Sequence, residues 1–184
     1  MVTFASVANG QQSSQQQLSN SSTDAELLEL LASSNPVAAD NAAAMIITRG
    51  ERMIGPLMKL RGDKRFFAGV MSQSTGSANL VFVSSGDAKQ DKELLKLGKL
   101  VTMEVAAVYL ISAIYFETMN FAQSPYFRDL SLPKPKQKVG NTPKRIDRAW
   151  RATDKWYERF TELGIKKLRA SDDYPLKNSR VEFR

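Results

Sequence analysis

"VAAVYLISAIYF", residues 105–116, is an almost wholly apolar stretch between Glu104 and Glu117. Upstream of it, apolar side chains recur at steps of three and four residues from Leu94, which predicts one long helix over 87–121. Because the second half of this helix is apolar on nearly every side, we expect it to be enclosed at the centre of a helical core. It is shorter than the roughly 20 apolar residues of a membrane span, so no integral span is expected. We expect the two flanking glutamates to meet water at the ends of the apolar part.

Two shorter helices are predicted before this one. Thr23 and Glu26 form a capping-box pattern, which starts a helix that ends before Pro36. Pro36 then suits the first turn of a second, alanine-rich helix, and the Gly-Pro pair at 55–56 should break that helix. Together with the central helix, these elements are expected to form a helical core domain over 23–127.

Two other N-terminal segments are not expected to be helical. The tract 9–22, "NGQQSSQQQLSNSS", cannot bury enough apolar surface to offset its ordering entropy, so residues 1–22 are predicted to be a disordered polar arm. "RFFAGVMSQ" and "ANLVFVSS" are β-prone and flank a turn-like "STGS", which predicts a short β-hairpin over about 65–84. The expected fold class is mainly α, with a helical core, this hairpin, the polar arm and a basic C-terminal region.

The C-terminal third begins with a segment rich in proline and lysine. "YFRDLSLPKPKQKVGN" predicts an extended basic linker, assigned to 128–142. Thr142 and Pro143 then predict the start of an amphipathic helix over 143–170, and the tail 171–184 is expected to be irregular.

Helical geometry divides the side chains of that last helix into two faces. One arc contains Ile146, Ala149, Trp150, Thr153, Tyr157, Phe160 and Leu168, with Trp156 at its edge. A cationic stripe on the opposite side contains Lys144, Arg148, Arg151, Lys155 and Arg159. The large aromatic residues are therefore expected to belong mainly to the core. A base-stacking platform would instead place them beside the charges on an exposed face.

Composition excludes several classes of enzyme. The chain has no cysteine and no histidine, which removes disulfides, thiol catalysis, cysteine-based zinc sites, the Ser-His-Asp triad and HExxH zinc sites. Glu104 and Glu117 would stand about 20 Å apart on one helix, too far for a two-carboxylate mechanism. We therefore expect a non-enzymatic protein with no cofactor and no metal site.

The charge of the chain is segregated. The formal net charge is +7, yet residues 1–48 contain no Lys or Arg, while residues 121–184 contain sixteen of them against eight Asp or Glu. Such asymmetry favours a polyanionic partner for the C-terminal third. The same stripe would also suit an ordinary solvated face of an amphipathic helix, and these two interpretations stay open here.

Thirteen basic residues are candidates for phosphate contacts. Those of the C-terminal region are Lys134, Lys136, Lys138, Lys144, Arg145, Arg148, Arg151, Lys155 and Arg159, and a second patch contains Lys59, Arg61, Lys64 and Arg65. Neutralising several phosphates in this way gives strong, salt-sensitive and sequence-independent binding. No zinc-finger, RNP1 or KH-type motif that would read bases is present.

A mobile arm, a helical body and segregated cations together indicate a structural protein that packages nucleic acid. This layout is similar to that of helical viral coat or nucleocapsid proteins, and the similarity is one of layout, with no shared motif. The predicted function is non-enzymatic self-assembly with nucleic-acid binding, RNA being favoured over DNA, in a homo-oligomer. The sequence does not indicate where the protein is located; a viral protein of this kind would be cytoplasmic or in the virion. Two alternatives remain: a scaffold subunit with a basic docking face, and an accessory protein at an anionic membrane surface.

Overall fold

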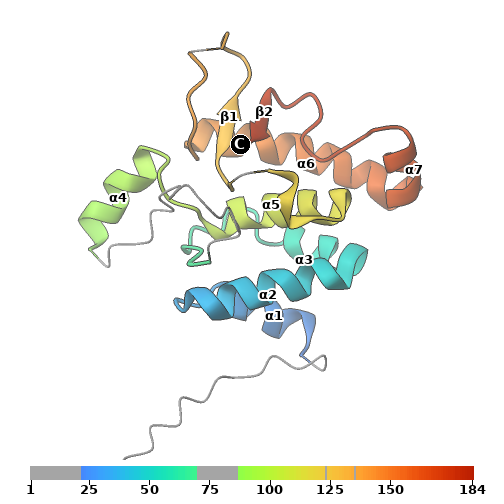
Figure 1. Cartoon of the computed structure of the whole chain (residues 1–184), viewed down its shortest axis with the longest axis horizontal. Helices are drawn as coiled ribbons and strands as arrows, with labels where there is room; N and C mark the ends of the chain where they lie inside the picture. Colours follow the sequence, from blue (N-terminus) through green and yellow to red (C-terminus); the bar gives the residue numbers. More distant parts are fainter. Residues whose placement is uncertain (1–21, 70–86, 123, 135) are drawn as a thin grey trace, which may run out of the picture.

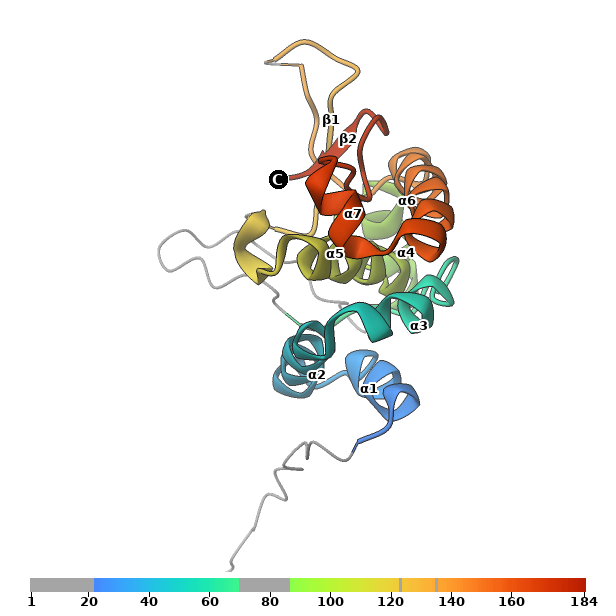
Figure 2. The same ribbon diagram turned by 90° about the vertical axis from the view of Figure 1, so that its right-hand side faces the viewer.

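The central element of the fold is helix α5 (Met103–Phe116), which is enclosed between two groups of helices (Figure 1). The computed structural model describes residues 22–69, 87–122, 124–134 and 136–184. Every residue of α5 from Met103 to Tyr115 is buried, as expected of a helix with no polar face. Helices α2 and α3 pack against one side of α5 and α6 packs against the other (Figure 2). The prediction of a mainly α protein with an enclosed apolar helix is confirmed.

The first group of helices consists of α1 (Asp24–Leu31), α2 (Pro36–Arg49), the 3-10 turn η1 (Gly50–Met53) and α3 (Ile54–Met58). The capping box of Thr23 and Glu26 is formed, and Asn35 caps α2 ahead of Pro36. The predicted break at 55–56 is wrong, because α2 ends at Gly50, where φ is +63°. Pro56 lies in the first turn of α3, where its missing N–H costs no intrahelical bond.

The prediction of a single helix over 87–121 is also wrong, because the structure has two helices in this range. Helix α4 (Ala88–Lys96) ends before Gly98, and α5 begins at Met103. Gly98 has φ +66°, and its carbonyl accepts a 2.7 Å hydrogen bond from the backbone N–H of Asn141. A Cβ at this glycine would lie 2.7 Å from that same nitrogen. The long-range contact therefore overrides the local helical periodicity.

The segment between α4 and α5 pairs with the start of the predicted hairpin. Phe66 and Thr102 form an isolated antiparallel bridge, and the N–H of Phe67 donates to Val101 O at 2.9 Å. The rest of the predicted hairpin, from 70 onward, lies outside the described residues, as does nearly all of the predicted arm, 1–22.

The second group contains α6 (Pro143–Leu163), α7 (Ile165–Ala170) and two short strands, β1 (Phe127–Asp129) and β2 (Val181–Phe183). The predicted helix over 143–170 is interrupted at Gly164, which separates α6 from α7 with φ +74°. The prediction of an irregular tail is wrong at β2. This strand pairs antiparallel with β1 in the register Phe127 to Phe183, because alternate tail side chains, those of Val181 and Phe183, are buried against the core.

The apolar face of α6 enters the same core as α5. Trp150 and Trp156 are buried, which confirms that the large aromatics belong to the core, and Trp156 lies deeper than the edge position predicted for it. One hydrophobic cluster contains residues from α1 through β2. In the described part of the chain, no helix has both the length and the apolar character needed to span a membrane.

Candidate nucleic-acid interface

Asp129, at the end of β1, anchors the start of the basic linker. Its carboxylate accepts hydrogen bonds from the N–H and hydroxyl of Ser131 and from Arg148 Nη1 at 3.3 Å. Arg145 Nε lies 3.8 Å from the same carboxylate. The hydrogen bonds from Ser131 lower the pKa of Asp129 below its usual range. The charges of Arg148 and Arg145 lower it further, by smaller amounts. The linker is therefore fixed to the first turns of α6 at this end.

Asn141 fixes the other end of the linker from a buried position. Its Oδ1 accepts from the backbone N–H of Phe127 at 3.2 Å, and its Nδ2 donates to the carbonyls of Leu100 and Pro125 at 3.2 and 3.1 Å. The side-chain amide thus joins three segments that are distant in sequence. Between Asp129 and Asn141, the chain forms the exposed loop that carries Lys134, Lys136 and Lys138.

Arg145 is placed inside the protein. It is 8% exposed, and its Nη1 donates to the carbonyl of Gly140 at 3.0 Å. Its Nε is buried and has no hydrogen-bond partner among the described residues. Arg145 therefore holds the linker against α6, and its guanidinium does not face solvent.

All the other candidate arginines are engaged in ion pairs. Those of α6 pair as Arg148–Asp129, Arg151–Asp147 and Arg159–Asp173, and those of the second patch as Arg61–Asp154 and Arg65 with both Asp63 and Glu29. Among the candidate lysines, Lys64 alone forms an ion pair with a described residue, the buried Glu104. The expectation that Glu104 meets water is therefore wrong: it is 3% exposed and also accepts from the N–H of Gly62.

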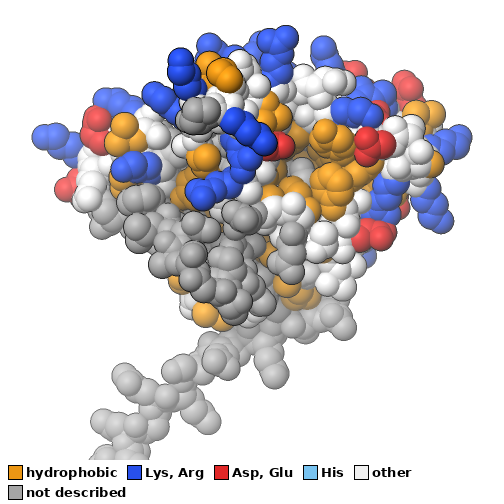
Figure 3. All heavy atoms as spheres, turned by 45° about the horizontal axis from the view of Figure 1, so that its top comes forward, with side chains coloured by type: hydrophobic (Ala, Val, Ile, Leu, Met, Phe, Trp, Pro, Cys, Tyr) orange, Lys and Arg blue, Asp and Glu red, His pale blue; other side chains and the backbone are white. Residues whose placement is uncertain are grey.

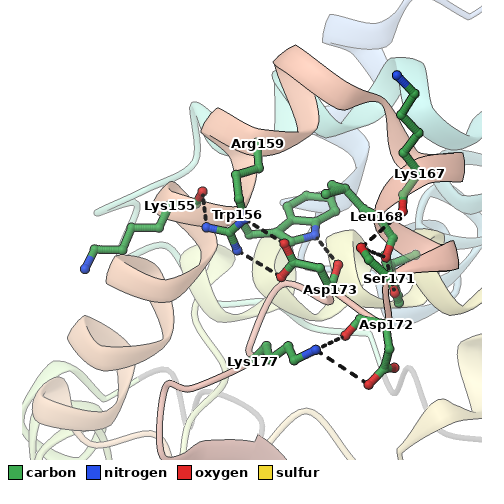
Figure 4. Close-up of polar contacts among 10 residues, drawn as sticks. Lys155, Trp156, Arg159, Lys167, Leu168, Ser171, Asp172, Asp173 and Lys177 are labelled. Atoms are coloured by element: carbon green, nitrogen blue, oxygen red, sulfur yellow. Dashed lines mark hydrogen bonds and ion pairs between the residues drawn. The ribbon is translucent and has the colours of Figure 1, made fainter.

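Arg159 shows how such an arginine holds the C-terminal segment (Figure 4). Its Nε and Nη2 donate to the two carboxylate oxygens of Asp173 at 2.6 and 2.9 Å. Trp156 Nε1 donates to the Asp173 carbonyl at 2.8 Å. Two side chains about one turn apart on α6 thus bind one residue of the tail. The ammonium of Lys155 points away from these contacts in the same view.

The two basic patches meet through one ion pair. Arg61, which follows α3, pairs with Asp154 in the middle of α6. Burial raises the pKa of Asp154 above its usual range even though Arg61 acts in the opposite direction. The patch at 59–65 is therefore next to the cationic stripe of α6 in space, which sequence spacing alone does not show.

The remaining candidate cations share one property: they are exposed and form no ion pair with any described residue. They are Lys59, Lys134, Lys136, Lys138, Lys144 and Lys155, called here the lysine surface. Lys and Arg side chains are prominent on the face of the molecule seen in Figure 3. Compact ammonium groups on flexible stems act as point charges and suit contacts with phosphate oxygens. With the tryptophans buried, the lysine surface has the chemistry of a sequence-independent phosphate contact.

A second feature was not predicted from the sequence. An apolar groove of about 510 Å³ lies between α5, β2 and the segment that precedes β2. Its lining comes from four separated parts of the chain, so no local pattern could have revealed it. Within the described residues, no cluster of three or more acidic side chains could hold a metal ion.

No protein-family model, curated protein or solved structure matches the chain.

Proposed function

We propose that the protein is a non-enzymatic, self-assembling structural protein that binds nucleic acid, as a coat or nucleocapsid protein does. The observation that carries this proposal is that its arginines and its lysines have different roles. The arginines hold the fold together through ion pairs, whereas the lysine surface has no intramolecular partner among the described residues. Cations left without internal partners are the ones that can replace the counterions of a phosphate backbone.

RNA is the favoured polyanion in this proposal. The lysines of the loop lie between two fixed points, Asp129 and Asn141, so both ends of the loop are held near α6 while the lysine side chains are exposed to solvent. Such a surface tolerates any sequence and a variable backbone path, which is what packaging a long strand requires.

The test is RNA binding by the full chain across a salt series. The variant Lys134→Gln/Lys136→Gln/Lys138→Gln should lower the affinity for an unrelated single-stranded RNA oligonucleotide. It should also reduce the slope of log affinity against log salt by about 2, since each lost phosphate contact removes about 0.7. Fluorescence anisotropy with RNA and DNA oligonucleotides of the same length measures both effects.

A matched control removes the same charge elsewhere. Lys92, Lys166 and Lys167 are exposed on α4 and α7 and have no ion pair with a described residue, so their joint change to Gln should leave the slope unchanged. An affinity independent of salt, or an equal loss in both triple variants, would refute the phosphate contact.

The two alternatives make different predictions. A scaffold subunit would purify with one acidic protein and without nucleic acid. A membrane-surface protein could not insert α5 into the bilayer surface without unfolding, because α5 is buried from Met103 to Tyr115. Flotation with anionic liposomes measures binding to a membrane surface.

A further inference from the structure

The apolar groove described above is lined largely by aromatic and aliphatic side chains. Its lining includes Phe116, Phe121, Leu130, Tyr174, Leu176 and Phe183. Phe116 and Leu130 are 41% and 42% exposed, so this lining is open to solvent. Figure 3 shows apolar side chains exposed together on this face, with Lys, Arg, Asp and Glu side chains at their edges. A groove of this size and character suits an apolar segment with few charges.

The chain itself contains such a segment. Residues 1–8, "MVTFASVA", carry Met1, Val2, Phe4 and Val7, and no charged side chain occurs before Asp24. Burying this segment costs no desolvation of a charged side chain, and Phe4 supplies an aromatic anchor for an aromatic lining. The tract 9–22 that follows is polar and supplies a spacer.

The position of the groove decides which copy supplies the segment. Ser22 leads into α1, which lies with α2 on one side of α5, whereas β2 and the groove lie on the opposite side (Figures 1 and 2). Within one copy, the spacer would have to run around the α1–α2 layer and α5. A neighbour stacked head to tail would present its groove next to α1. The spacer 9–22 reaches at most roughly 50 Å when extended, enough to cross such a contact.

We propose that residues 1–8 of one copy bind in the apolar groove of a neighbouring copy. This inference deepens the self-association part of the proposed function and rests on that part, but it does not depend on nucleic acid. Because segment and groove are different surfaces, the contact is heterologous and repeats from copy to copy along an open chain.

Two variants of the full chain test the contact. Phe4→Asp puts a charge in the segment, and Leu130→Glu puts one in the groove. Light scattering of nuclease-treated protein should show a mass that rises with concentration for the unaltered chain and the monomer mass for each variant. An equimolar mixture of the two variants should double that mass and go no further. One variant keeps a working groove and the other a working segment, so only a dimer can form.

Two further variants separate loss of the contact from misfolding of the protein. Phe116→Glu is a second change in the groove, for the case in which Leu130→Glu alters the circular dichroism spectrum. Leu97→Glu is the matched control, because Leu97 is 60% exposed and does not line the groove. It should assemble as the unaltered chain does.

Three results would overturn the proposal: Phe4→Asp assembling as the unaltered chain does, a mixture that stays monomeric, or an unaltered chain that is itself monomeric with the segment bound in its own groove. The salt-series measurement on the same variants separates this failure from that of the proposed function. Phe4→Asp should keep the RNA affinity of a single protomer, whereas the lysine triple variant should lose it and still assemble.

Discussion

At the scale of single residues, a buried carboxylate controls how the second basic patch joins the core. Glu104 has 4% of its side chain exposed, and its partner Lys64 has 60% exposed. The two ends of this ion pair are therefore not equivalent. Without Glu104 the ammonium of Lys64 can return to water, but without Lys64 the carboxylate keeps only neutral hydrogen-bond donors, such as the N–H of Gly62.

This asymmetry predicts unequal effects of the two substitutions. Lys64→Met should lower the free energy of unfolding by about 2–3 kcal/mol, because it leaves the buried carboxylate of Glu104 without a charged partner. Glu104→Gln should lower it by about 1 kcal/mol, the scale of one net hydrogen bond. Urea unfolding at pH 7 measures both, and an equal or smaller effect of Lys64→Met would contradict the explanation.

Gly98 is a residue at which the backbone itself decides the fold. It ends α4 in the left-handed region and lies against the backbone of Asn141 and Thr142. A side chain here would meet main-chain atoms that are held by the buried amide of Asn141 and so cannot easily move.

We therefore expect Gly98→Ala to cost more than the left-handed conformation alone. That conformation costs about 1 kcal/mol, and the displaced backbone should bring the total above about 2 kcal/mol. Gly62→Ala is the control, because Gly62 has φ +79° but open space around it. Thermal unfolding of both variants should therefore show the larger loss for Gly98→Ala.

At the scale of elements, the basic linker is anchored at both ends, by Asp129 and by Asn141. Asp129 holds its start through Ser131, Arg148 and Arg145, and these contacts favour the charged carboxylate. Because the folded-state pKa of Asp129 is lowered, its stabilising contribution is present above the pKa of the unfolded chain, about 4. That contribution is lost as pH falls through the folded-state value.

The lowered pKa of Asp129 predicts how the free energy of unfolding depends on pH. Asp129→Asn should lower the free energy of unfolding by about 1–2 kcal/mol at pH 7, since charge-assisted hydrogen bonds are lost. The difference between the two proteins should shrink as the pH falls below 4. Asp147→Asn removes only an exposed pair with Arg151 and should change stability by no more than about 0.5 kcal/mol. Urea midpoints measured at pH 7, 5 and 3 test this, and a difference as large at pH 3 as at pH 7 would contradict the assignment.

At the scale of the whole molecule, α6 shares its core with the helices that precede it. One apolar cluster includes residues of α1, α5, α6 and β2, so it crosses the boundary between the core predicted at 23–127 and the helix predicted at 143–170. Arg61 and Asp154, which are 93 residues apart in sequence, tie α3 to α6 across the same boundary. We therefore expect the described part of the chain to unfold as one unit.

The positions of the two tryptophans make this expectation measurable. Both lie on α6, so their fluorescence reports that helix, whereas far-ultraviolet circular dichroism reports all the helices. The two signals should lose their native values at the same urea concentration. A fluorescence transition displaced from the circular dichroism transition would show that α6 unfolds separately.

Features that depend on neighbours along the chain could be predicted from the amino-acid sequence. The capping box at Thr23, the enclosed apolar helix and the buried face of α6 follow from spacing, and all three are present. The tertiary structure alone decided where helices end, which cations are available and where the groove forms. Gly98 ends a helix because Asn141 meets it, Arg145 turns inward to Gly140, and Asp154 engages Arg61 from across the fold. The physical reason is that periodicity and caps act over one or two turns, whereas ion pairs and cavities join residues that only folding brings together.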